Sequence, residues 1–186
     1  MRLGTWVMSG ISILKDGISL IEYYGTDLDT LAEGDQVGVV RTSNDELIFY
    51  VNGESQGVAV MNIPKTLYAL VNLYGKCVQV SITPPDSLEY SMNATHRVQN
   101  IDLPISIDVS VTTSPASIPL NSSQIGDFMD INDRLRFHNR CGSLVKLSPN
   151  SRTAERRRPL DEFNNGVVMT HRALKDNELF EIRIDK

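Results

Sequence analysis

The chain has 186 residues, of which 41% are hydrophobic and 22% are charged, and its formal net charge is −5. This composition is typical of a soluble globular protein with one or two domains. The acidic balance argues against nucleic-acid binding, because affinity for a phosphate backbone needs a dominant basic face. Two cysteines, Cys77 and Cys141, are too few for a disulfide framework or a zinc-binding RING module, and they indicate a reducing compartment.

No segment approaches the roughly 18 apolar residues that are needed to cross a bilayer, so we expect a protein that is not integral to a membrane. Residues 3–14 are largely apolar, but Gly10 and Ser12 interrupt them, and a Lys-Asp-Gly turn follows where a cleavage site would lie. We therefore interpret this stretch as part of the mature fold. The sequons at Asn93 and Asn121 then lack the secretory context that glycosylation requires.

Short runs of β-branched and aromatic residues, separated by turn residues, predict strands throughout residues 5–82. The clearest of them are residues 36–42, residues 46–51 and a strand that runs on through Val58. Asn52 and Gly53 stand between the last two and predict a type I′ hairpin turn, because both residue types tolerate a positive φ.

Two more strands are expected at residues 67–73 and 77–82, separated by a turn at Tyr74, Gly75 and Lys76, and we expect them to close an antiparallel meander. Cys77 then lies inside an apolar strand, where its thiol behaves as a small hydrophobic group. Trp6 also lies in an apolar strand, and we expect it to anchor the core.

Five of the eight prolines fall within residues 84–119, in a background rich in Ser, Thr, Asn and Asp. We interpret residues 84–133 as a linker, and their composition predicts disorder because it offers too little apolar area to bury. Residues 101–111 are the exception, since apolar and polar residues alternate there as in an edge strand.

Strands resume after the linker at residues 144–147, 166–170 and 179–185. Short alternating strands on both sides of the linker predict an all-β fold, an antiparallel β-sandwich in which each sheet buries one face. The three expected segments are therefore residues 1–83, 84–133 and 134–186.

Catalytic chemistry finds little support in this sequence. The three histidines are scattered, and no glycine-rich phosphate loop, nucleophile elbow or fixed carboxylate pair is present. His138 and Cys141 have a spacing that zinc could use, but no second pair completes four ligands. We therefore expect neither an enzyme nor a bound metal or cofactor.

The residues most suited to contact a partner are exposed aromatic and basic side chains in loops, because such residues are enriched at interfaces. The basic stretch at residues 152–159 could bind an acidic peptide or a lipid headgroup, although a solvated loop between strands is the simpler interpretation. The turns at residues 15–17 and 175–177 are interpreted as structural. The candidate partner-binding residues are Tyr23, Tyr24, Tyr74, Lys76, Arg156, Arg157 and Arg158.

Two blocks of sequence resemble a known repeat. The first comprises residues 3–17, 24–28, 33–39, 50–53, 57–59 and 71–77, and it is similar to the C-terminal part of a Neuralized homology repeat (NHR) domain. The second comprises residues 137–142, 152–154, 165–168 and 174–185, and it resembles the N-terminal part of such a domain. A C-terminal part followed by an N-terminal part implies tandem repeats, as in the family's multi-repeat members rather than those that end in a RING.

The resemblance implies a galectin-like or SPRY-like sandwich that binds protein partners. It also implies a cytoplasmic and centrosome-associated scaffold linked to ubiquitin ligases. The family's founding member recruits Notch ligands and contacts phosphoinositides, so a substrate-recognition subunit of such a ligase is an alternative. The central part of the repeat is found in neither block, which implies unpaired sheet edges that a second chain could occupy.

A sugar-binding sandwich is a further alternative. Residues 137–140 are superficially suggestive, but a sugar site stacks its ligand on a tryptophan beside polar residues. Trp6, the only tryptophan, is followed by the apolar residues Val7 and Met8. A protein-interaction module is therefore the favoured hypothesis.

Overall fold

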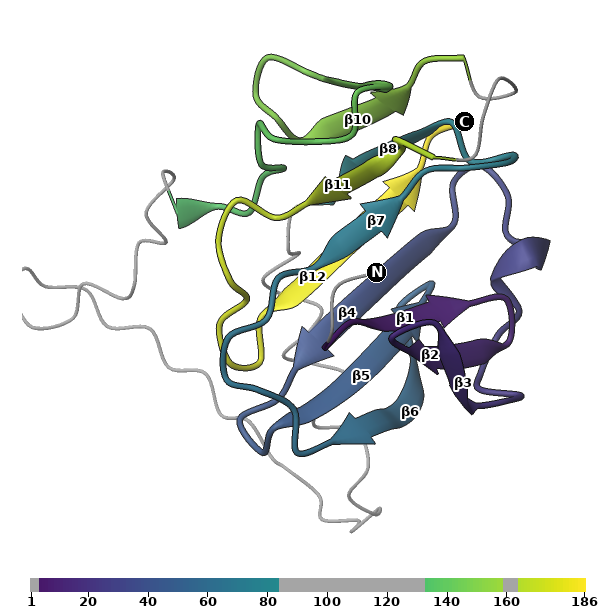
Figure 1. The fold of residues 1–186 in the computed structure, drawn as a ribbon, viewed down its shortest axis with the longest axis vertical. Helices are drawn as coiled ribbons and strands as arrows, with labels where there is room; N and C mark the ends of the chain where they lie inside the picture. The colour runs from purple at the N-terminus through teal and green to yellow at the C-terminus, as the bar shows by residue number, and fades with distance from the viewer. Residues whose placement is uncertain (1–3, 84–132, 159–163) are drawn as a thin grey trace, which may run out of the picture. The chain divides into compact units, whose positions relative to one another are not determined.

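A computed structural model describes residues 4–83, 133–158 and 164–186. The chain divides into two compact units, one formed by Met1–Pro85 together with Leu135–Lys186 and the other by Asp86–Arg134. The first unit is the sandwich described below (Figure 1). The predicted linker at residues 84–133, its edge strand and both sequons lie almost entirely outside the described residues. None of the described helices is long and apolar enough to cross a membrane.

The larger layer of the sandwich is a sheet of seven strands that pair antiparallel throughout. Their order across the sheet is β6-β5-β4-β12-β8-β10-β9. The strands are β4 (Gln36–Arg41), β5 (Glu46–Val51), β6 (Glu54–Met61), β8 (Gln79–Ile82), β9 (Val145–Leu147), β10 (Thr153–Arg156) and β12 (Leu179–Ile184).

Strands from both blocks of sequence interleave in this sheet. Strand β12 of the second block lies between β4 and β8 of the first, with Phe180 opposite Val39 and Ile184 opposite Val80. Apolar residues alternate along β12, so Phe180 and Ile182 are buried while Arg183 is exposed. The two blocks therefore close into one sheet within a single chain.

The second layer consists of two smaller sheets that cover the inner face of the large one. One contains β1 (Trp6–Ser9), β2 (Ser12–Lys15) and β3 (Ile18–Ile21) in that order, and the other pairs β7 (Leu70–Asn72) with β11 (Val167–Met169). A short 3₁₀ helix, η1 (Leu28–Thr30), follows β3. The prediction of an antiparallel all-β sandwich is confirmed.

Each small sheet packs on its own cluster of buried residues. The cluster under β7 and β11 includes Phe137 and Phe180, whose rings meet edge to face with centroids 6.3 Å apart. The cluster under β1–β3 includes Met8, Ile13 and Tyr24. The cluster under β7 and β11 therefore contains residues of both sequence blocks, whereas the cluster under β1–β3 contains residues of the first block alone.

The Asn52–Gly53 turn joins β5 to β6 as predicted, with φ values of 51° and 78°. Asn52 also ties this turn to the start of β4, because its Oδ1 accepts from the N–H of Gln36 at 2.8 Å. The turn therefore fixes the hairpin and its neighbour together.

The predicted meander of residues 67–82 is wrong in its pairing. Strand β7 pairs with β11 in the second layer, whereas β8 pairs with β10 and β12 in the large sheet. The turn at Tyr74–Lys76 thus carries the chain from one layer to the other. Cys77 precedes β8 instead of lying within it, although its half-buried side chain packs against the core as expected.

Trp6 was expected to anchor the core, and this prediction is also wrong. Its side chain is only half-buried on the edge strand β1, and it belongs to neither buried cluster. The Nζ atom of Lys15 lies 5.7 Å from the centre of the indole ring. Apolar neighbours in the sequence predicted burial, but β1 is an edge strand of its three-stranded sheet.

Candidate functional site

The central residue of the candidate site is Arg156, the last residue of β10. The sequence placed it in a solvated basic loop at residues 152–159, but Thr153–Arg156 form a strand between β8 and β9. Ala154 and Arg156 point inward in alternation, and Arg156 is only 1% exposed. The expectation that Arg156 is exposed is therefore corrected.

The guanidinium of Arg156 is held by main-chain oxygens from two loops. Its Nη1 donates to the carbonyl of Leu73 at 2.6 Å, and its Nη2 donates to the carbonyl of Asn164 at 3.0 Å. Charge-assisted bonds of this kind are stronger than neutral ones, which makes the burial of a charged group affordable. Arg156 thus fixes the loop that begins after β7 and the loop that leads into β11.

Gly166 makes this arrangement sterically possible. A Cβ atom at this buried position would collide with the carbonyl oxygen of Leu73 and with Nη1 of Arg156. The main chain of Leu73 also approaches Gly166 directly, because its N–H donates to the carbonyl of Gly166 at 3.0 Å. Glycine is therefore the residue that this contact between β7 and β11 requires.

Four of the predicted partner-binding residues lie at the end of the large sheet where Arg156 is buried. The N–H of Arg156 donates to the carbonyl of Val78 at 2.7 Å, which continues the pairing of β10 with β8. Because the two strands are antiparallel, residues 157–158 after β10 and the turn at residues 74–76 before β8 lie at the same end of the sheet. We call the exposed residues Tyr74, Lys76, Arg157 and Arg158 the basic loop surface.

Sequence reasoning missed an apolar face that adjoins this surface. Outward-facing residues of the β7–β11 sheet remain between 42% and 48% exposed, and they are Tyr68, Leu70 and Val167 together with Tyr74. The unbroken apolar run at residues 67–71 was the available signal, because only alternate residues of a two-layer strand can face the core. The basic loop surface therefore borders a patch of aromatic and aliphatic side chains.

Tyr23 and Tyr24 lie elsewhere, on the side of the sandwich where β3 covers β6. Tyr24 is buried, and its hydroxyl donates to the carbonyl of Gly57 at 2.6 Å while its ring meets Phe49 edge to face. Burial raises the pKa of Tyr24. Its expected exposure is thus corrected, whereas Tyr23 is 83% exposed.

The cysteine and histidine that were considered for reactive chemistry have surroundings that do not activate them. Burial raises the pKa of the Cys77 thiol to about 11, and the nearby Asp185 carboxylate contributes to this, so the thiolate is disfavoured. Nδ1 of His138 accepts from the N–H of Arg140 at 2.9 Å. No group of three or more potential metal ligands occurs in residues 4–83, 133–158 and 164–186.

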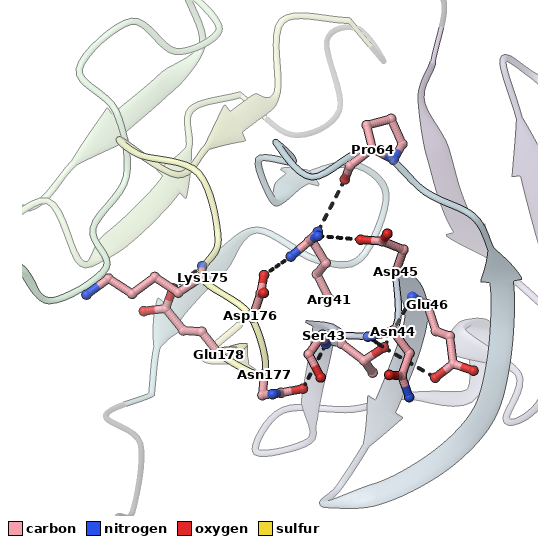
Figure 2. Close-up of polar contacts among 11 residues, drawn as sticks. Arg41, Ser43, Asn44, Asp45, Glu46, Pro64, Lys175, Asp176, Asn177 and Glu178 are labelled. Atoms are coloured by element: carbon pink, nitrogen blue, oxygen red, sulfur yellow. Dashed lines mark hydrogen bonds and ion pairs between the residues drawn. The ribbon is translucent and has the colours of Figure 1, made fainter.

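A second buried arginine lies at the opposite end of the large sheet, where β12 begins. Arg41 is 2% exposed, and its guanidinium contacts Asp176, the carboxylate of Asp45 at 2.6 Å and the carbonyl of Pro64 at 3.2 Å (Figure 2). Asn177 of the same turn accepts from the N–H of Ser43 at 3.1 Å. These contacts join turns of the two sequence blocks and leave the arginine no surface for a ligand.

Aromatic and arginine side chains such as those at this end of the sandwich are enriched in the interfaces of protein complexes. The Neuralized family model matches residues 1–84 and 137–186, and the chain therefore belongs to the Neuralized family. The NHR domain of this family is in general a protein-interaction module and not a catalytic one. No solved structure matches the chain.

Proposed function

We propose that the chain is a protein-interaction domain of a scaffold or adaptor that carries tandem NHR repeats, similar to the multi-repeat Neuralized-like protein 4. The order of the sequence blocks supports this proposal, because residues 1–83 resemble the C-terminal part of one repeat and residues 134–186 the N-terminal part of the next. The same resemblance supports a cytoplasmic, centrosome-associated protein that acts together with ubiquitin ligases.

The basic loop surface is the binding site in this proposal. The observation that carries it is the pair of hydrogen bonds by which buried Arg156 holds the Leu73 and Asn164 loops in place. A surface that is ordered before binding loses little conformational entropy when a partner docks. Its basic rim and neighbouring apolar face fit a partner segment in which acidic residues flank apolar ones.

A capture experiment tests this assignment. The 186-residue chain is immobilised and exposed to cytosolic extract, and the bound proteins are quantified by mass spectrometry. We expect ubiquitin-ligase and centrosomal proteins to bind the native chain and to be lost from the triple variant Tyr74→Ser, Arg157→Ala, Arg158→Ala. Their binding should weaken with salt, because exposed charge pairs are screened.

The matched control removes two positive charges at the other end of the sandwich. Lys65 and Lys175 are both exposed and are the chain neighbours of Pro64 and Asp176. The variant Lys65→Ala, Lys175→Ala therefore changes the net charge by the same two units as the loss of Arg157 and Arg158. This control should retain its partners. Equal capture by the triple variant and the native chain would remove the basic loop surface from the proposal.

The alternative ligand of the same surface is a phosphoinositide headgroup. Sedimentation with vesicles that contain phosphoinositide distinguishes the two, since a lipid ligand requires binding without any protein partner. We expect no binding above that of vesicles with the same charge in phosphatidylserine. Selective binding that the triple variant abolishes would assign the surface to lipid instead.

A further inference from the structure

The second layer of the sandwich is divided in two, although both parts lie on one face of the large sheet. Val37 packs against the cluster under β7 and β11, while Val51 belongs to the cluster under β1–β3. Val37 and Val51 are directly opposite each other on β4 and β5, and opposite residues of paired strands point to the same face. The two small sheets therefore cover neighbouring halves of the same surface.

Strand β7 has one edge that no strand of the described residues pairs with. The hydrogen bonds from Thr170 N–H to Ala69 O and from Leu73 N–H to Gly166 O show that residues 69, 71 and 73 bond toward β11. Main-chain groups alternate in direction along a strand, so those of Leu70 and Asn72 point to the other side. No main-chain partner of Leu70 or Asn72 occurs on that side in the described part of the chain.

Strand β1 has a similar open edge. The N–H of Asp16 donates to the carbonyl of Thr5, which sets the hydrogen-bonded pairs between β1 and β2 at residues 5, 7 and 9. The main-chain groups of Trp6 and Met8 therefore point away from β2. The buried Nε1 of Trp6 also lacks an acceptor among the described residues, so this edge carries an unsatisfied side-chain donor as well.

These two edges face each other across the middle of the large sheet. Beyond β3, the hydroxyl of Tyr24 reaches Gly57 on the outermost strand β6, so β1 is the inner strand of its sheet. Beyond β11, Gly142 and His138 donate to Val167 and Met169 on the way to the opposite outermost strand β9, so β7 is inner as well. In Figure 1 the strands β11, β7, β1, β2 and β3 follow one another across the front layer.

We infer that the space between β7 and β1 is a site for strand addition, at which an extended segment of a partner protein completes the second layer. An edge strand of another folded copy could satisfy only one of these two edges, because its own sheet occupies its other side. A single free segment can bond to both, with alternate amide groups directed to β7 and to β1. This site is distinct from the basic loop surface.

The surroundings define the chemistry of the segment. Half-buried Val37, Val39 and Phe49 form the floor between the two clusters, so every second residue of the partner should be apolar and β-branched. The intervening side chains face solvent. Lys15 lies opposite Trp6 on the same face of β1–β3, at its exposed end, and forms no ion pair among the described side chains, which favours an acidic residue where the segment passes Trp6.

Amide hydrogen exchange by NMR on the 186-residue chain tests the site. In the free protein the amides of Trp6, Met8, Leu70 and Asn72 should exchange rapidly, whereas Val7 and Val71 should be protected. The probe is a short synthetic peptide in which valine alternates with threonine and glutamate. At millimolar concentration it should slow exchange of the four edge amides by about tenfold or more. It should also shift the indole N–H signal, which is unique because Trp6 is the only tryptophan.

Two N-methylated peptides are the matched controls. Methylation of odd-numbered amides removes the donors to one edge, and methylation of even-numbered amides removes the donors to the other. Both should lose binding if the segment bonds to both strands. Retention by either one would reduce the site to simple pairing with a single edge and overturn the inference. A scrambled peptide without alternation should not protect the edge amides.

Three other results would also overturn the inference. The first is protection of the four edge amides in the free monomer, because the site would then already be filled. The second is unchanged exchange at millimolar peptide. The third is protection that appears only together with a concentration-dependent dimer in sedimentation, because the occupant would then be a second copy of the chain.

Discussion

Arg41 on β4 and Asp176 in the turn before β12 form an ion pair that joins residues 135 positions apart in the sequence. The guanidinium is buried, whereas the Asp176 side chain is 58% exposed. Losing these contacts costs the buried guanidinium far more free energy than it costs the carboxylate, because water can hydrate an exposed carboxylate instead. The buried arginine is the stabilising element of this contact.

The first prediction follows from this asymmetry. Arg41→Ala should lower the free energy of unfolding by about 2–4 kcal/mol, since it empties a buried position and releases three acceptors from three different loop segments. Asp176→Ala should cost less than about 1 kcal/mol, because Arg41 keeps Asp45 and the Pro64 carbonyl. Urea unfolding of both variants measures the difference. Equal losses would show that the ion pair itself, and not the burial of Arg41, stabilises the contact.

The second prediction concerns Gly166. Gly166→Ala should destabilise the protein by about 2–4 kcal/mol, because the added Cβ overlaps a main-chain oxygen that cannot move independently of β7. It should also weaken partner capture, since the bond from Arg156 to Leu73 is displaced. Thermal unfolding and the capture experiment are the measurements.

The control for this change is Gly75→Asn in the neighbouring turn. Gly75 has a φ of 62° and open space around its Cβ position, and asparagine tolerates that conformation. The expected cost is below about 1 kcal/mol. A larger loss for Gly75→Asn than for Gly166→Ala would contradict the steric role of Gly166.

The strands and tight turns could be predicted from the sequence because their signals are local. Alternation of apolar residues identified β12, and the Asn52–Gly53 pair identified the hairpin between β5 and β6. Periodicity does not specify which distant strand is the partner, since every apolar strand offers the same main-chain groups. The pattern of apolar residues therefore could not predict that β7 and β8 lie in different layers.

Arg156 shows why the candidate site was only partly predictable. A charged residue in an apolar alternation argues for a loop, because burying a guanidinium without acceptors is costly. Its acceptors are the main-chain carbonyl groups of Leu73 and Asn164. Every residue has such a group, so the sequence does not indicate where these acceptors lie. Arg157 and Arg158, which were expected to be exposed as part of a basic loop, are exposed because they follow the end of β10.

The third prediction concerns acid stability. Burial by itself raises the pKa of Glu178, but Arg172 and the N–H of Lys175 outweigh it and hold this pKa below its usual value. Both carboxylate oxygens accept from Arg172, at 2.6 and 2.7 Å. Because the folded pKa is lowered, this contribution to stability is complete above the usual glutamate pKa of about 4.3 and is lost as the pH falls through the lower folded value.

The unfolded state binds more protons than the folded state in that acidic range, so stability should rise with pH there. Glu178→Gln and Arg172→Met should each flatten this rise, since neither variant retains the ion pair. Urea unfolding between neutral pH and the acidic range measures the slope. A slope equal to that of the native chain in both variants would rule out Glu178 as a contributor. Some dependence of stability on pH should remain in both variants, because the pKa of Asp185 is also lowered.

The last prediction concerns the dependence of the two sequence blocks on each other. Residues 1–83 and 134–186, expressed separately, should each fail to fold cooperatively. The first fragment lacks β12 and would leave the facing edges of β4 and β8 unpaired, while the second keeps only β9–β12 and lacks the strand that pairs with β11. Fragments of this size rarely gain more than about 3–5 kcal/mol from one core.

Mixing the two fragments should restore the near-ultraviolet circular dichroism of the intact chain. Association must then overcome the entropic cost of joining two molecules, so the restored signal should depend on concentration, unlike that of the 186-residue chain. Arg41→Ala in the first fragment should shift this dependence to higher concentration, because it removes the ion pair that bridges the fragments. Independent cooperative unfolding of either fragment alone would mean that the two blocks are separate domains and that their shared sheet is not what stabilises them.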